Sequence, residues 1–171
     1  MKARRVLSRY LLVVASAGVL ALTTSCDAFI VEARFRSVTH CAGWNTWEFF
    51  RWATPARVRG CLAFGADAKA RNRFGLTPLH HASAVTDYPA VIRALVVAGS
   101  WVDARTGDGR TPLHLAARST ENPAVIEALL AAGANAAARD IKGLTPWDYA
   151  QDNVFLRGTD TYWRLHDGRF R

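Results

Sequence analysis

The sequence lacks the short motifs that position a catalytic nucleophile, a nucleotide phosphate or a catalytic zinc ion. No G-x-S-x-G, P-loop, H-E-x-x-H or glycine-rich dinucleotide-binding pattern occurs in its 171 residues. Pairs of carboxylates occur only in segments that we expect to be solvated loops and helix surfaces. We therefore expect a protein that is not an enzyme and that carries no cofactor and no metal ion.

The sequence also lacks long apolar runs. The longest run that it does contain is relevant to export. Residues 11–22 form a run of twelve apolar or small residues, which as a helix would span about 18 Å. A bilayer core is ~30 Å thick. The run follows a basic segment, residues 1–10, and precedes small polar residues 23–25. This is the three-part layout of a secretory signal peptide, so residues 1–25 are predicted to be an export signal.

Cysteine is scarce, and the first of the three cysteines, Cys26, directly follows the predicted signal. Its placement resembles the lipobox of bacterial lipoproteins, in which a cysteine becomes the lipidated first residue. The resemblance implies a lipid anchor on Cys26. Two alternatives remain open: plain cleavage with release of the protein, and an uncleaved anchor. Residues 26–42 are then predicted to be a tether.

Acidic residues are few relative to basic ones, 14 against 22, for a formal net charge of +8. Four basic residues lie before the first acidic residue, and residues 26–171 carry 18 basic and 14 acidic side chains. In that part of the chain the two signs alternate, whereas binding to a phosphate backbone normally requires a dense basic patch or stripe. We do not expect a nucleic-acid partner.

What the sequence does contain is one hexapeptide written three times. T-P-L-H-H-A at residues 77–82 returns as T-P-L-H-L-A at 111–116 and as T-P-W-D-Y-A at 145–150, so the interval between copies is constant. A fixed period of this length is typical of stacked repeats. The pattern resembles the ankyrin repeat. The resemblance implies an all-α solenoid of paired antiparallel helices with short finger turns.

The register of glycine and proline extends the repeats in both directions. Gly65 and Pro55 lie one period before their counterparts in the first full repeat. We predict a degenerate N-terminal cap repeat at 43–76, full repeats at 77–110 and 111–144, and a C-terminal cap repeat at 145–171. In the first cap, Asn45 is expected to cap a helix with Glu48 three residues on. In the last cap, a helix at 160–165 is expected to precede a solvated charged tail at 166–171.

Two cysteines remain once Cys26 is set aside. Cys61 occupies the repeat position of Leu95 and Leu129 and should be buried, and Cys41 lies just before the first helix of the same cap. An even pair in an exported protein is compatible with a disulfide, which would close a loop of about 20 residues and add ~3 kcal/mol. Two buried thiols are the alternative.

Histidine and arginine recur in fixed columns. The resemblance implies that His80 and His114 hydrogen-bond to their threonine and to neighbouring backbone. Arg71, Arg105 and Arg139 also follow one another at the repeat period. They are interpreted either as scaffold groups that bond to neighbouring loop carbonyls or acids, or as a stripe that meets an acidic partner.

Positions at which the repeats differ are better candidates for recognition, because exposed aromatic and arginine side chains are typical interface anchors. They lie at the finger tips and on the inner helices, where the fifth hexapeptide residue is expected to face a partner. The predicted partner-binding residues are Arg73, Phe74, Leu76, His81, Asp108, Arg110, Leu115, Arg118, Lys142 and Tyr149.

Together these features predict a non-catalytic protein–protein interaction module in the bacterial cell envelope. It would bind a partner protein through finger tips and the concave helix face, and touch the membrane only through a lipid anchor. The alternative is a freely periplasmic or secreted ankyrin protein that supports or protects another enzyme, or acts on a host protein.

Overall fold

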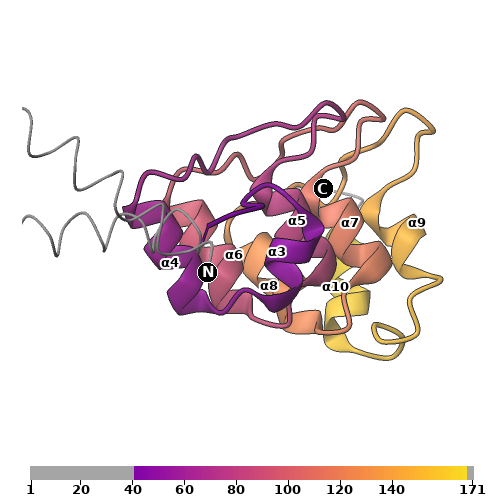
Figure 1. Ribbon diagram of the computed structural model, residues 1–171. Helices are drawn as coiled ribbons and strands as arrows, with labels where there is room; N and C mark the ends of the chain where they lie inside the picture. The colour runs from indigo at the N-terminus through magenta and orange to yellow at the C-terminus, as the bar shows by residue number, and fades with distance from the viewer. Residues whose placement is uncertain (1–40, 169–171) are drawn as a thin grey trace, which may run out of the picture. The chain divides into compact units, whose positions relative to one another are not determined.

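The computed structural model describes residues 41–168, whose regular secondary structure is entirely helical (Figure 1). The predicted signal, Cys26 and residues 26–40 of the predicted tether lie outside the described residues. The eight helices of this described part form four consecutive pairs: α3 (Trp47–Trp52) and α4 (Pro55–Ala63), α5 (Pro78–Val85) and α6 (Pro89–Val97), α7 (Pro112–Ser119) and α8 (Pro123–Ala131), α9 (Pro146–Ala150) and α10 (Asp160–Gly168). The predicted all-α repeat fold is confirmed. Within residues 41–168, no helix is long and apolar enough to cross a membrane.

The helices stack in two layers. The inner layer runs α3, α5, α7 and α9, and the outer layer runs α4, α6, α8 and α10, with each helix contacting the next one in its layer (Figure 1). The connections from each outer helix to the next inner helix, the fingers, extend together along one side of the helices (Figure 1). A single pair has too little apolar surface to form a core alone, so neighbouring pairs complete it.

The sequence determines where most helices start. Proline occupies the first position of every helix from α4 to α9, where its missing N–H would lack a partner in any case. Threonine precedes that proline at four of the six starts, for example Thr54, whose Oγ1 accepts a hydrogen bond of 3.3 Å from the N–H of Arg57. This capping satisfies an N–H group that the helix itself cannot.

The predicted cap of the first helix is wrong by one residue. Thr46, not Asn45, is the N-cap of α3, and its Oγ1 accepts from the N–H of Phe49 at 3.3 Å. The Asn45 Nδ2 instead donates to the carbonyls of Leu76 at 3.3 Å and Ala70 at 3.4 Å. Asn45 therefore binds the first finger to the first inner helix.

The core lies between the two layers and repeats with the sequence. Leu79 and Leu113 of the inner helices are fully buried, as are Ile92 and Leu95 of α6 and their counterparts in α8. These outer-helix residues are three positions apart, which places them on one face of the helix. The apolar columns read from the sequence are thus the surfaces that meet between repeats.

The fingers end in tight turns that require glycine. Gly109 adopts a φ of 78°, a left-handed conformation that glycine adopts without steric cost. A Cβ atom at this position would lie 3.1 Å from the backbone nitrogen of Ile141 in the next finger. That nitrogen donates to the carbonyl of Asp108 at 3.1 Å. A side chain at position 109 would therefore strain its own turn and disturb the contact between fingers.

The N-terminal cap is closed by aromatic packing and a cysteine pair. Trp44 packs against Phe49 and Phe50, with ring centroids 5.3 and 5.4 Å apart. The Sγ atoms of Cys41 and Cys61 are 2.08 Å apart, at disulfide distance, and their Cα atoms are 5.6 Å apart. Cys61 is buried, so the pair links the start of the cap to its second helix.

The last helix of the C-terminal cap is longer than predicted. Helix α10 continues to Gly168 instead of ending at residue 165, so the solvated tail does not begin at His166. The imidazole of His166 packs against Trp147, with centroids 4.9 Å apart, and Trp147 also contacts Tyr162 at 4.3 Å. This aromatic packing extends the helix past its expected end and covers the last repeat.

Replacing Leu113 with alanine should lower the free energy of unfolding by about 2–5 kcal/mol, because Leu113 is completely buried between neighbouring repeats. Chemical denaturation measures this loss. Val97→Ala is the matched control, because Val97 is 88% exposed on the outer layer. A loss below about 1 kcal/mol for Leu113→Ala, or an equal loss in the two variants, would contradict the packing described here.

Candidate functional site

The fifth hexapeptide residue has a counterpart in the first cap that the sequence analysis missed. Trp47, His81, Leu115 and Tyr149 follow one another at the repeat period on the four inner helices. The first three line a groove of about 910 Å³ between the inner helices and the first two fingers, called here the inner groove. Trp47 was missed because its repeat lacks the T-P-L-H signature, although the period alone locates it.

The inner groove brings together most of the predicted partner-binding residues. Seven of the ten line it: Arg73, Phe74, Leu76, His81, Asp108, Arg110 and Leu115. The other three, Arg118, Lys142 and Tyr149, lie outside it. Besides Trp47, the groove also contains Arg71 and Arg105, which the analysis had noted as a column without including them among the candidates.

Aromatic surface is exposed on both walls of the groove. Phe74 at the first finger tip is 58% exposed, and Trp47 on α3 is 50% exposed. The guanidinium carbon of Arg73 lies 4.7 Å from the centroid of the Phe74 ring, within the range of a cation–π contact. Two large apolar side chains and a cation thus face solvent without being needed for the core.

His81 is not an exposed recognition residue, contrary to the prediction. It is only 9% exposed, and burial lowers its pKa, so the imidazole is neutral at pH 7. Its Nε2 is buried and has no hydrogen-bond partner among the described residues. His81 therefore forms part of the groove wall, and its buried Nε2 atom has no hydrogen-bond partner among the described residues.

The histidines of the signature connect repeats. Nδ1 of His80 accepts a hydrogen bond of 3.1 Å from the N–H of Thr77, so its proton is on Nε2. Nε2 then donates to the carbonyl of Arg110 in the next finger, at 3.2 Å. His114 repeats the arrangement with Thr111, and its Nε2 donates to the carbonyl of Leu144 at 3.1 Å. The structural role implied by the resemblance is what the geometry shows.

These bonds require neutral imidazoles. Burial lowers the pKa of His80 from 6.5 to about 4, and the hydrogen bond to Arg110 opposes that shift only partly. Burial also lowers the pKa of His114. Protonation would place a second proton on Nδ1 and break the bond from threonine.

The arginine column belongs mainly to the scaffold. Nη1 of Arg71 donates to the carbonyl of Arg105 at 3.1 Å, and Nη1 of Arg105 donates to the carbonyl of Arg139 at 2.7 Å. Arg139 donates within its own finger, to the carbonyl of Gly143. Each of the first two arginines thus bonds to the backbone of the next repeat, in agreement with the first of the two interpretations.

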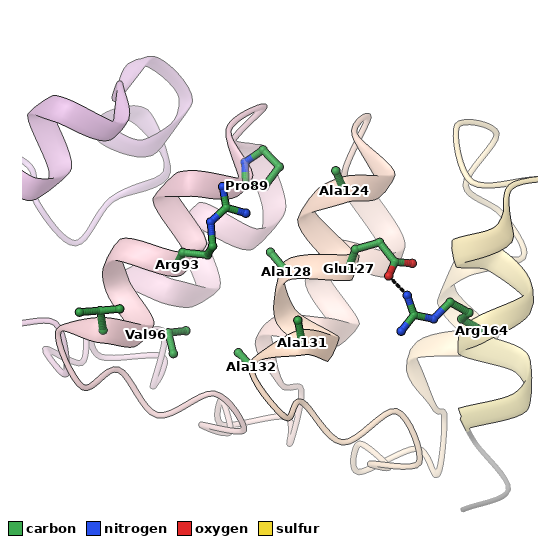
Figure 2. Close-up of a pocket in the computed structure, with 10 residues that line it drawn as sticks. Pro89, Arg93, Val96, Ala124, Glu127, Ala128, Ala131, Ala132 and Arg164 are labelled. Carbon is green, nitrogen blue, oxygen red and sulfur yellow. Dashed lines mark hydrogen bonds and ion pairs between the residues drawn. The ribbon is translucent and has the colours of Figure 1, made fainter.

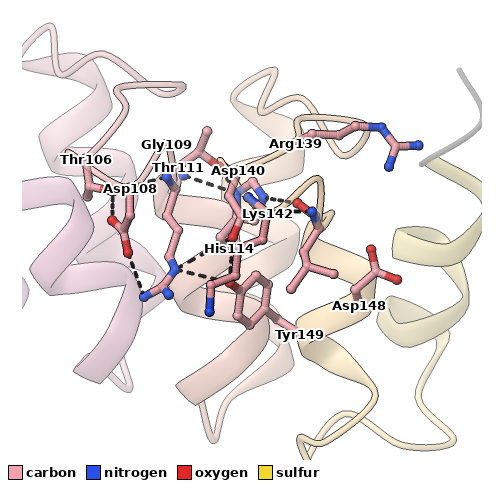
Figure 3. Close-up of polar contacts among 12 residues, drawn as sticks. Thr106, Asp108, Gly109, Thr111, His114, Arg139, Asp140, Lys142, Asp148 and Tyr149 are labelled. Atoms are coloured by element: carbon pink, nitrogen blue, oxygen red, sulfur yellow. Dashed lines mark hydrogen bonds and ion pairs between the residues drawn. The ribbon is translucent and has the colours of Figure 1, made fainter.

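Arg110 and Tyr149 were predicted to contact a partner protein. In the structure they contact each other. The Tyr149 hydroxyl donates to Oδ2 of Asp140 at 2.6 Å, and Nε of Arg110 donates to the Tyr149 oxygen at 3.2 Å. Arg110 also pairs with Asp108 at 3.2 Å. Figure 3 shows Asp108 and Asp140 of the second and third fingers together with Tyr149 of α9.

The carboxylate of Asp140 is the centre of this network. Burial opposes its charged form, but the hydrogen bonds from Tyr149 and from the N–H groups of Leu144 and Lys142 outweigh burial and lower its pKa. For Tyr149, burial and the bond to Asp140 raise the pKa. The network is therefore Asp⁻ and neutral tyrosine over the physiological range, and it fixes the relative position of two repeats.

The change from histidine to aspartate in the last repeat has a local reason. Oδ2 of Asp148 accepts from both the N–H and the Oγ1–H of Thr145, at 2.7 Å each. It thus replaces the Nδ1 atom of histidine at the helix start. An ionised carboxylate has no proton to donate to a following finger, which suits the last T-P hexapeptide of the chain.

A second hollow lies on the outer layer (Figure 2). It has a volume of about 640 Å³ and is lined by residues of α6, α8 and α10 and of the turn after α8, among them four alanines, Val96 and Val97. At one side Glu127 of α8 and Arg164 of α10 form an ion pair, drawn in Figure 2. That pair holds α10 against the stack and neutralises both charges, so the hollow has less recognition chemistry than the inner groove.

The described residues also contain no group of three or more His, Cys, Asp or Glu side chains that could hold a metal ion.

Comparison with known protein families agrees with the geometry. The model for ankyrin repeats (3 copies) matches residues 56–140. The chain belongs to the ankyrin-repeat family. Ankyrin repeats are generally protein–protein interaction modules and are typically non-catalytic. Among curated proteins, no match was found. In this ankyrin-repeat protein, the inner groove is therefore the candidate site for binding another protein.

The signature histidines should make stability depend on pH. The pKa of His80 is about 4 in the folded protein and 6.5 in the unfolded chain. Unfolding at a pH between these two values is therefore accompanied by uptake of a proton. The free energy of unfolding should therefore fall by up to about 3 kcal/mol from this one group as the pH drops from 6.5 to 4. Urea denaturation across this range measures the slope.

His80→Asn is the control, because an amide can retain hydrogen bonds without titrating. Its slope should be shallower than that of the unmodified protein, with His81 and His114 supplying the rest. Unchanged or increased stability on acidification to pH 4 would contradict the neutral, bridging histidine.

Proposed function

We propose that this ankyrin-repeat protein is a non-catalytic module that binds another protein in the inner groove. The observation that carries the proposal is the pair of half-exposed aromatic side chains, Trp47 and Phe74, on opposite walls of one groove. Neither is required for stacking, and exposed aromatic surface next to arginine is typical of binding hot spots.

Other residues of the repeated pattern already form hydrogen bonds or ion pairs within the protein. In the first two signatures, threonine bonds to histidine and the histidine bonds to the next finger. Tyr149 is bonded to Asp140, and Arg110 to Asp108. Recognition therefore falls to the side chains that differ between repeats, and the inner groove collects more of them than any other described hollow.

We further propose that the module acts in the bacterial cell envelope, facing the periplasm. Support comes from the sequence of residues 1–26: a basic start, a short apolar run and a cysteine at the end. A cysteine pair at disulfide distance, Cys41 and Cys61, suits an oxidising compartment. Fatty-acid label that is lost in Cys26→Ser would establish the anchored form, whereas recovery of the protein in the medium would favour the secreted alternative.

Photocrosslinking in cells tests the binding site. A photoreactive phenylalanine at position 74 should yield one specific adduct with another protein, because this side chain stands at the rim of the inner groove. The same amino acid at position 97 is the matched control, since Val97 is 88% exposed on the outer layer. It should give no specific adduct.

The absence of an adduct from position 74, or the same adduct from both positions, would overturn the assignment of the inner groove. Circular dichroism of both variants would show that the repeats remain folded.

A further inference from the structure

The chemistry of the inner groove specifies its occupant more closely. We infer that the groove binds an extended, acidic segment of the partner protein that also carries an aromatic or aliphatic side chain. This inference rests on the proposed function, since it assumes that the inner groove is the binding site.

The charge of the groove is strongly one-sided. Four guanidinium groups line it, those of Arg71, Arg73, Arg105 and Arg110. Asp108 is the single carboxylate in the lining, and it already accepts from Thr106 Oγ1 at 2.6 Å and pairs with Arg110 at 3.2 Å. The lining histidines are neutral. The groove therefore retains a net positive charge that attracts carboxylates.

The arginines keep donors for a ligand. A guanidinium carries five N–H donors. Among the described residues, Arg71 hydrogen-bonds only through Nη1, to the carbonyl of Arg105, and its guanidinium carbon also lies 5.7 Å from the centroid of the Trp101 ring. Within the same residues, Arg105 hydrogen-bonds only through Nη1, to two carbonyls. Arg73 makes a cation–π contact with Phe74 and no hydrogen bond to any described residue. Because the first two are held by backbone, their remaining N–H groups are pre-oriented and lose little entropy on binding a carboxylate.

Apolar contacts accompany the charge. Trp47, Phe74 and Leu115 contribute apolar surface to the same groove. A partner side chain that covers Phe74 would also cover the stacked guanidinium of Arg73, and such desolvation strengthens its pairing with a carboxylate. A purely acidic segment would leave this surface in water, so we expect alternating acidic and apolar side chains.

A random library of peptides displayed on phage tests the inference on the protein purified after export. Peptides selected by the unmodified protein should be enriched in Asp and Glu together with aromatic or aliphatic residues. The strongest binder, made synthetically, should lose at least about 10-fold in affinity when its carboxylates become amides. Its binding should also weaken between ~50 and ~300 mM salt.

Two arginine variants localise the effect. Arg73→Glu should lower the affinity for the same peptide at least about 10-fold, whereas Arg93→Glu should leave the affinity unchanged. Arg93 is exposed on α6 of the outer layer and lines the other hollow, so it is a matched charge reversal away from the groove. Circular dichroism of both variants checks the fold.

Enrichment of basic or neutral peptides, no enrichment, equal effects of the two charge reversals, or tighter binding of single-stranded RNA would overturn the inference. The proposed function and the acidic-segment inference can be refuted by different results. A crosslinked partner whose contact segment is not acidic would refute the acidic occupant but leave the groove as the binding site. Acidic peptides that bind while position 74 captures nothing in cells would refute the proposed function alone.

Discussion

A single hydrogen-bonding device holds the repeats in register. The neutral imidazole of His80 accepts from the start of its own helix and donates to the carbonyl of Arg110, 30 residues away. His114 does the same one repeat later. The device fixes each finger over the preceding inner helix, and the apolar core, the arginine–carbonyl bonds and the contacts between fingers follow that alignment. Asn45 and Asp148 each supply part of it at the two ends of the array.

This device also determines where recognition can occur. Because the signature residues are committed to the scaffold, they cannot contact a partner without loosening the stack. The inner groove combines side chains that change from repeat to repeat with Arg71 and Arg105 of the constant arginine column. These side chains are placed on rigid helices and tight turns. Rigid presentation matters for affinity, because ordering flexible side chains on binding costs about 0.5–1.5 kcal/mol each.

Much of the fold could be predicted from the sequence, because the constant period of the hexapeptide locates both the helix starts and the buried columns. The candidate site could be predicted only in part. The period would have located Trp47, had the degenerate cap been read in the same register. The burial of His81 could not be predicted, since it depends on how a finger closes over α5. The network of Arg110, Asp140 and Tyr149 could not be predicted either. It joins groups up to 39 residues apart in the sequence, and it depends on the directions in which their side chains point.

The central claim is that the signature histidines are neutral bridges and not recognition groups. Nitrogen-15 NMR of histidine-labelled protein tests it directly, because it reports which ring nitrogen carries the proton. The account predicts that His80 holds the proton on Nε2 at pH 5.5 and that His114 does so at pH 7, and that both keep that state when a groove ligand is added. A proton on Nδ1, or titration of both rings near the ordinary pKa of 6.5, would contradict it.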